Sequence, residues 1–170
     1  ADEHGISHLL EHMLFKGTGK RTCDEINTDI AKIGGYTNAY TSVDRTAFYI
    51  SSAAEHWKTT TEILSDLVWN NTIPEDEFDK ERQVIIEEIK MYDDNPQDKC
   101  MAELQDMIYK DHANMHNIIG TIESVSAIKR QQMLDYIDKY YVPSNACIIA
   151  CGNIDHDEFV KYVKSIVPFD

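Results

Sequence analysis

The chain has 170 residues, of which 42% are hydrophobic and 27% charged, and we interpret residues 1–170 as a single folded domain. Its net charge is -14, from 16 Lys and Arg against 30 Asp and Glu, and such a surface repels nucleic-acid phosphates, so we expect no nucleic-acid partner. No apolar run reaches the roughly 20 residues that span a membrane, so we expect no membrane partner either.

Two helices are predicted at the start of the chain. Residues 5–16 carry apolar side chains at helical spacing: Ile6, Leu9, Leu10, Met13 and Leu14. Glycines at positions 17 and 19 end this helix. The second helix begins after Thr22, which forms a capping-box pattern with Glu25, and it ends at the glycines of positions 34 and 35.

A pair of strands follows the second helix. Residues 36–51 are rich in Thr, Tyr, Phe and Ile, which favour extended backbone. We place a turn at residues 42–45. This segment therefore predicts an antiparallel hairpin.

Helices dominate the rest of the chain. We expect one over residues 55–69, with Leu64, Leu67 and Val68 facing inward, and a longer one that Pro74 opens and that continues to residue 93. Further helices are predicted over residues 98–109, 126–140 and 157–166, and a loop over residues 111–120. Residues 146–151 form a continuous apolar run, which predicts a buried strand.

These elements predict an α+β fold, an antiparallel sheet covered by helices. The predicted strands are too few for a stable sheet of their own. We therefore expect part of the sheet to be missing from these residues, and we interpret the chain as a fragment of a longer protein.

The chain contains four cysteines: Cys23, Cys100, Cys147 and Cys151. None of them forms a CxxC pair, so neither a disulfide framework nor a cysteine metal site is indicated. Cys147 and Cys151 would share one face of the predicted strand and pack there as apolar side chains. We expect reduced thiols and a cytoplasmic location.

The first helix carries a motif with metal chemistry. His8 and His12 are four residues apart, so on a helix they lie on one face, one turn from each other, and can chelate one Zn²⁺. Glu11 points toward the same opening, where a carboxylate can take a proton from a water. The order H-x-x-E-H is that of the inverted zincins. The alternative is a helix with two surface histidines and an acid.

The long helix offers candidates for a third ligand. With Ile85 at the centre of its apolar face, Glu81 and Glu88 fall beside that face, whereas Glu87 falls on the opposite side. Carboxylates on a buried face are costly unless they are paired or bound to metal. Glu88 or Glu81 is therefore a better candidate than Glu87. The alternative is that both reach solvent.

Several stretches together resemble the pitrilysin-type (M16) metallopeptidases over nearly the whole chain. They are HGISHLLEHMLFKGT at residues 4–18, GGYTNAYT at 34–41, RTAFY at 45–49, ERQVIIEEI at 81–89 and YVPSN at 141–145. The residues around positions 88–96 are most similar to those of the smaller bacterial, processing-peptidase-like members.

The resemblance implies a role for each candidate residue. It makes His8, His12 and Glu88 the zinc ligands and Glu11 the general base. Glu81 becomes a carboxylate that orients a ligating imidazole. Asn38 and Ala39 then belong to the edge strand that binds the substrate backbone by strand addition.

The resemblance also implies a function and partners. The chain would be the N-terminal catalytic domain, without its first strands, of a longer multi-domain protein. That protein would be a zinc-dependent endopeptidase, a metalloprotease that hydrolyses unfolded peptides. A second M16-like domain or subunit would close a chamber over the zinc. The alternative is a non-catalytic M16-like subunit for peptide binding or assembly, although such subunits usually lose motif residues that are present here. A structural zinc module would need a fourth ligand, and none is apparent.

Overall fold

The computed structural model describes residues 3–110, 112 and 117–167. In chain order these residues form α1 (Ile6–Leu14), α2 (Cys23–Lys32), β1 (Tyr36–Thr41), β2 (Thr46–Ser51), η1 (Ala54–His56), α3 (Trp57–Trp69), α4 (Glu75–Asp94), α5 (Pro96–Ile108), α6 (Ile122–Ala127), α7 (Arg130–Tyr140), η3 (Pro143–Asn145) and α8 (His156–Ile166). The predicted α+β class is confirmed. None of the described helices is both long enough and apolar enough to cross a membrane.

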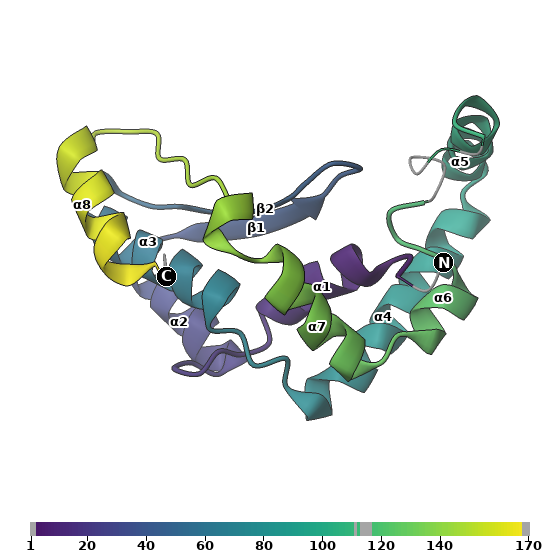
Figure 1. Ribbon diagram of the computed structural model, residues 1–170, viewed down its shortest axis with the longest axis horizontal. Helices are drawn as coiled ribbons and strands as arrows, with labels where there is room; N and C mark the ends of the chain where they lie inside the picture. Colours follow the sequence, from purple (N-terminus) through teal and green to yellow (C-terminus); the bar gives the residue numbers. More distant parts are fainter. Residues whose placement is uncertain (1–2, 111, 113–116, 168–170) are drawn as a thin grey trace.

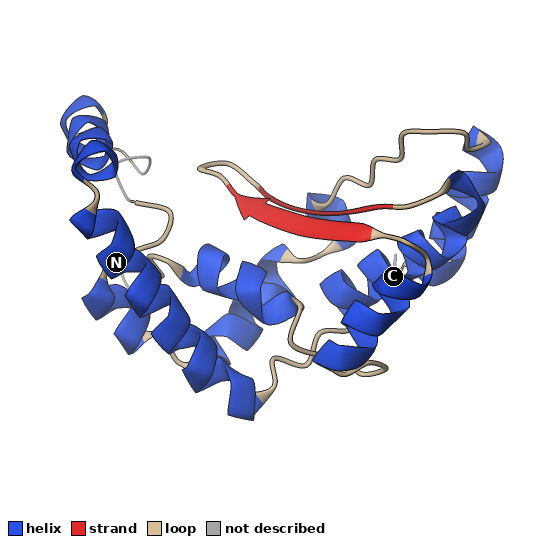
Figure 2. Cartoon of the chain, turned by 180° about the vertical axis from the view of Figure 1, so that it is seen from behind, coloured by secondary structure: helices blue, strands red, loops and turns tan. Residues whose placement is uncertain are grey.

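The sheet is a single hairpin with helices on one side. Strands β1 and β2 are antiparallel, and Tyr36 pairs with Ser51 at one end and Thr41 with Thr46 at the other. The predicted turn closes the hairpin, where the Ser42 N–H donates to the Arg45 carbonyl at 2.7 Å. Figures 1 and 2 show the strands crossing the molecule with α1, α2, α3 and α4 below them and with α5 and α8 at the two sides, and α1, α2 and α3 contact the strands.

Helix α1 lies at the centre of the main hydrophobic core. Its five apolar side chains are buried, and it packs against α4. Other parts of the chain complete this core, among them Ile73, Phe78, Ile85, Ile89, Ile119, Val125, Ile128 and Met133. A second cluster joins α2 to α3 through Ile26, Ile30, Ile63 and Leu67. The spacing of the apolar residues thus turns the polar face of α1 toward the hairpin and α4.

Both ends of α1 are held by distant segments. At its start Gly5 has a φ of 87°, and a Cβ there would lie 2.7 Å from the Ile119 carbonyl oxygen. At its end the Asn71 amide donates to the carbonyls of Met13 and Leu14, at 3.3 and 2.9 Å. The last carbonyls of a helix need such partners. Helix α1 is therefore fixed lengthwise as well as sideways.

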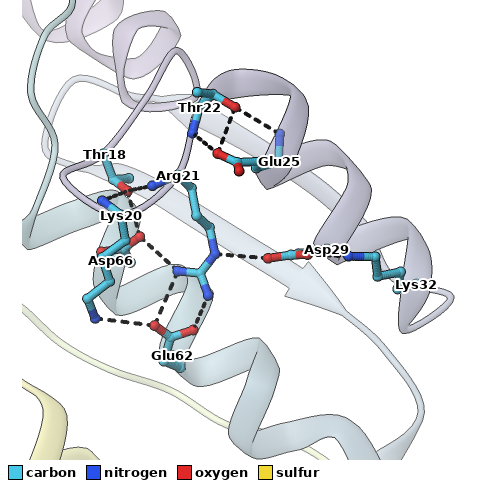
Figure 3. A network of polar contacts seen from close by, with 9 residues as sticks. All are labelled: Thr18, Lys20, Arg21, Thr22, Glu25, Asp29, Lys32, Glu62 and Asp66. Carbon is cyan, nitrogen blue, oxygen red and sulfur yellow. Dashed lines mark hydrogen bonds and ion pairs between the residues drawn. The ribbon is translucent and has the colours of Figure 1, made fainter.

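A polar network joins the loop after α1 to α3 (Figure 3). The Arg21 guanidinium donates to Asp66 at 2.8 Å, to Glu62 at 2.6 Å and to Asp29 at 3.1 Å. Asp66 is only 1% exposed and also accepts from the Thr18 hydroxyl at 2.7 Å. A buried carboxylate of this kind is tolerated because charged and polar donors surround it.

The inward face predicted for α3 is only partly right. Leu67 is buried, but Leu64 and Val68 are half-buried. The other buried positions of α3 are Ile63, Ser65 and the network residue Asp66. The sequence pattern did not predict that Asp66 is buried. A buried carboxylate can be predicted only when its cationic partner is known, and here that partner, Arg21, comes from another segment.

The helix predicted over residues 126–140 is wrong as a single element. Helix α6 ends at Ala127, Ile128 has extended backbone, and α7 begins at Arg130. The Ile128 side chain is buried in the core. The Arg82 guanidinium donates to the carbonyls that the break leaves free, those of Ser126 at 3.4 Å and Ile128 at 3.2 Å. Tertiary contacts therefore stabilise a break that the helical spacing does not show.

The buried strand predicted over residues 146–151 is also wrong. These residues form no strand, Ile149 is 84% exposed, and Cys147 and Cys151 are exposed as well. Neither strand of the hairpin pairs with them. Of the loop predicted over residues 111–120, positions 111 and 113–116 lie outside the described residues.

Candidate metal centre

Three possible metal ligands from two helices converge beside the hairpin. His8 and His12 lie one turn apart on α1, and Glu88 projects from α4 toward them. The Nε2 atoms of both imidazoles lie 3.9 Å from Glu88 Oε2. One ligand atom from each residue can be chosen so that all three lie within 4.8 Å of one another. The packing of α1 against α4 creates this cluster, since Glu88 is 76 positions away from His12 in the sequence.

The two imidazoles sit in a partly buried environment. The side chains of His8, His12 and Glu88 are 15%, 28% and 24% exposed. Burial, reinforced by the neighbouring His12, lowers the pKa of His8 to about 4. His8 is therefore uncharged at neutral pH, and its lone pair is available to a cation.

The donor set fits a zinc ion. Imidazole nitrogens and carboxylate oxygens are usual zinc ligands, and three protein ligands leave room for a water. The Nδ1 atom of His8 is buried and has no hydrogen-bond partner among the described residues. An uncharged, otherwise poorly satisfied imidazole beside a carboxylate is the kind of environment that a bound cation stabilises.

Glu81 lies behind His12 and not among the candidate ligands. Its Oε2 atom is 3.2 Å from His12 Nδ1, and its Oε1 atom is 2.5 Å from the Lys16 ammonium. The Glu81 side chain is 9% exposed, so Lys16 compensates a nearly buried charge. Of the two carboxylates that the helical wheel left open as candidates, Glu88 lies with the two histidines and Glu81 lies outside that cluster. Glu87 points away and pairs with Lys90 at 2.7 Å.

Glu11 lies on the same face of α1 and contacts the hairpin. Its Oε2 atom accepts a hydrogen bond of 2.5 Å from the Thr41 hydroxyl, at the end of β1. Its Oε1 atom has no hydrogen-bond partner among the described residues. One carboxylate oxygen of Glu11 is therefore held and the other is free to accept a proton.

Strand β1 presents a free edge next to this centre. Since Ser42 and Arg45 form a hydrogen-bonded pair, Asn38 and Tyr49 form one as well, and the main-chain groups of Ala39 point away from β2. The Ala39 N–H instead donates to the side-chain oxygen of Asn38 at 2.9 Å. No strand lies on that side of β1 within the described parts of the chain.

A groove of about 930 Å³ opens beside the centre. His8, Thr41 and Glu88 line one side of it. Helix α5 contributes apolar and acidic side chains to the other side, among them Asp98, Met101, Leu104 and Ile108. In Figure 1 the tip of the hairpin points toward α5. The centre is therefore open to an extended ligand.

The sequence patterns did not single out two residues of this site. Thr41 was only one polar residue of a predicted strand, and Lys16 was the end of a helix. The alternation of strand side chains placed Thr41 and Ala39 on one face, and Lys16 is four residues after His12, so each had a usable signal. The roles of all these residues stay predictions.

Two family models match the chain. Residues 1–122 match the model described as insulinase (peptidase family M16), and residues 127–167 match that of the peptidase M16 inactive domain. The first match includes α1, β1 and α4, and so every residue of the candidate centre.

Relatives with similar sequences are named as proteases. A protein of Rickettsia felis named an uncharacterized zinc protease is 38% identical over 166 residues, which are 98% of this chain and 40% of that protein. The mitochondrial-processing peptidase subunit beta of Bos taurus is 34% identical over 161 residues, 95% of this chain and 33% of that subunit. The chain therefore spans less than half the length of these relatives.

Solved structures share the fold. A protease from Helicobacter pylori superimposes with a TM-score of 0.93 at 26% identity, over 97% of this chain and 40% of that one. The first half of the periplasmic protease PqqL from Escherichia coli gives a TM-score of 0.87 at 25% identity, over 99% of this chain and 38% of that one. With a family model matching more than two thirds of its residues, the chain belongs to the M16 family of peptidases.

Proposed function

We propose that this chain carries the catalytic centre of a zinc-dependent endopeptidase that hydrolyses unfolded peptides. The observation that carries the proposal is the approach of His8, His12 and Glu88 to within 4.8 Å, with the Glu11 carboxylate on the same helix face. The zinc proteases among the relatives support the choice of metal. A His₂Glu donor set also suits a catalytic rather than a closed structural site.

Each residue has a separate task in this proposal. His8, His12 and Glu88 hold the metal, and Glu81 accepts the second N–H of the His12 imidazole and so fixes the ring. Zinc, when bound, supplies a Lewis acid that polarises the scissile carbonyl and lowers the pKa of a water. Glu11 takes the proton of that water through its free oxygen and hands it to the leaving amine.

The peptide would lie along the free edge of β1. An extended backbone can form strand hydrogen bonds with Ala39, and the groove beside the centre leaves room for its side chains. The Asn38 side chain, which accepts from the Ala39 N–H in the free protein, must then give way to the substrate carbonyl. We also propose that a second M16-like domain or subunit covers this groove, because the relatives are longer than this chain.

A non-catalytic peptide-binding or assembly subunit is the second candidate. The match of residues 127–167 to the inactive-domain model favours it. The presence of His8, Glu11, His12 and Glu88 favours the enzyme.

The substitution Glu11→Gln distinguishes the two candidates. It keeps the size of the side chain and its contact with Thr41 but removes the base. With zinc bound, hydrolysis of an unfolded fluorogenic peptide should fall by about 10²- to 10⁴-fold, while zinc affinity stays close to that of the wild type. Chelation of the metal should also abolish hydrolysis.

Glu87→Gln is the matched control, since Glu87 is exposed and points away from the centre. It should change neither hydrolysis nor metal affinity. A wild-type protein that binds zinc and peptide without cleaving the peptide would support the non-catalytic subunit instead. Equal hydrolysis by Glu11→Gln and the wild type would refute the role of Glu11.

A further inference from the structure

The side chain of Glu11 needs an external contact to be held in place. A glutamate on a helix surface has three rotatable bonds, and ordering it costs up to about 1.5–2 kcal/mol of side-chain entropy. The neighbouring helical positions of Glu11 supply no hydrogen bond to its carboxylate. The Thr41 hydroxyl, which comes from the hairpin, is its only hydrogen-bond donor among the described residues.

The hydroxyl of Thr41 is well placed to donate. Thr41 is half-buried at the last position of β1, directly opposite Thr46 on β2. Its oxygen lies 3.5 Å from the Thr46 hydroxyl, which can donate to it while Thr41 donates to Glu11. The Tyr141 phenol lies close to Thr46, and burial raises its pKa, so it stays protonated. Its hydroxyl forms no hydrogen bond with the described residues. The Thr46 hydroxyl thus supports the contact between Thr41 and Glu11.

Thr41 also belongs to the strand that carries the free edge. Only one residue separates it from Ala39, and both side chains lie on the face of β1 that looks toward α1. A strand is rigid over so short a distance when its partner strand pairs with each of its residues. The position of the Glu11 carboxylate is therefore coupled to the position of the peptide-binding edge.

We infer that Thr41 is a positioning residue, which aims the Glu11 carboxylate and ties the general base to the strand that binds the peptide. This inference rests on the proposed peptidase function. Thr41 lines the groove, but its hydroxyl donates to Glu11 and not to a candidate metal ligand. It holds one oxygen of Glu11 so that the other faces the reacting water.

The variants Thr41→Val and Thr41→Ser test the inference in the purified protein with zinc bound. Valine keeps the shape of the side chain without the hydroxyl, and serine keeps the hydroxyl. In Thr41→Val we expect kcat to fall by about 10- to 100-fold, the loss expected for one hydrogen bond to a charged group, with KM and zinc affinity within about twofold of the wild type. Thr41→Ser should restore most of the lost kcat.

Thr37→Val is the matched control, because Thr37 lies on the same face of the same strand but donates to the Tyr49 carbonyl at 3.2 Å, away from Glu11. It should leave kcat within about twofold of the wild type. A normal kcat in Thr41→Val would overturn the inference. So would a Thr41→Val variant whose loss lies in KM, because that pattern indicates a disturbed strand.

A stability measurement keeps the test independent of catalysis. In the metal-free protein, urea unfolding of Thr41→Val, Glu11→Ala and the double variant should show that the two substitutions, each of which removes the hydrogen bond, are not additive, which indicates direct coupling. Additive effects would overturn the contact. If the wild type cleaves no peptide but the two residues are coupled, the proposed function fails and the positioning contact stands.

Discussion

At the scale of single residues, the geometry of the candidate centre depends on a carboxylate that lies outside the cluster of three possible metal ligands. Glu81 accepts from His12 Nδ1 and is held in turn by Lys16. A hydrogen bond of this kind fixes the tautomer and the plane of a ligating imidazole and raises its basicity. The affinity for zinc should therefore depend on Glu81 although the metal does not touch it.

The substitution Glu81→Gln measures this dependence. It preserves the volume of the side chain but weakens the acceptor, and we expect zinc affinity to fall by about 10- to 100-fold. Competition with a chromophoric chelator gives the dissociation constant. Glu87→Gln on the same helix serves as control and should bind zinc as the wild type does. Equal affinities of the two variants would show that Lys16 and Glu81 form only a structural ion pair.

Most of this centre could be predicted from the sequence for a physical reason. The spacing of His8, Glu11 and His12 places them on one face of the helix once the segment is helical. The helical projection of α4 places Glu81 and Glu88 beside its apolar face and Glu87 on the opposite side. The helical projection did not show whether Glu81 or Glu88 lies next to the two histidines. That choice depends on how α1 and α4 meet, which is a tertiary property. The contact between Thr41 and Glu11 was missed for the same reason.

At the scale of elements, the placement of α1 depends on a glycine that allows two segments to approach each other. Gly5 has a positive φ, and a Cβ there would lie 2.7 Å from the Ile119 carbonyl oxygen and 2.9 Å from Val125 Cγ2. Gly34 also has a positive φ, of 61°, but a Cβ there would meet no atom within 4 Å. A side chain at Gly34 would therefore meet only backbone strain, whereas one at Gly5 would meet backbone strain and a steric clash.

Alanine at these two positions should therefore have different effects. Gly34→Ala incurs only the left-handed strain, about 1–2 kcal/mol. Gly5→Ala adds a backbone collision at the start of α1, and we expect its free energy of unfolding to fall by about 2 kcal/mol more than that of Gly34→Ala. Urea unfolding of both metal-free variants measures the difference. Equal losses would indicate that the segment at Ile119 moves aside without cost.

The boundaries of the elements were predictable where the determinants are local. The capping box of Thr22 and Glu25 forms as expected, with both of its hydrogen bonds present. Pro74 precedes the first residue of α4, and Asn95 separates α4 from α5, which begins at Pro96. The break at Ile128 was not predictable, because Arg82, a residue of another helix, stabilises it.

At the scale of the whole molecule, the segment at residues 146–151 behaves unlike its sequence pattern. Its apolar run is typical of a buried strand, but a strand forms only when another strand supplies hydrogen-bond partners. In Figure 1 this part of the chain leads from α7 to α8 without joining the hairpin. Its exposed apolar side chains and unpaired backbone are a template for pairing with another chain. We therefore expect the protein described by these 170 residues to self-associate through this segment.

The substitution Ile149→Lys tests this expectation. Because Ile149 is 84% exposed, its replacement should change the free energy of unfolding by no more than about 0.5 kcal/mol, while sedimentation velocity at micromolar concentration should show less self-association. Leu67→Ala serves as control for the stability assay, since Leu67 is fully buried and its truncation should cost about 2–5 kcal/mol. A loss of stability in Ile149→Lys comparable to that of Leu67→Ala would mean that this segment is packed in solution. Unchanged self-association would place the contact on another surface, with the free edge of β1 as the next candidate.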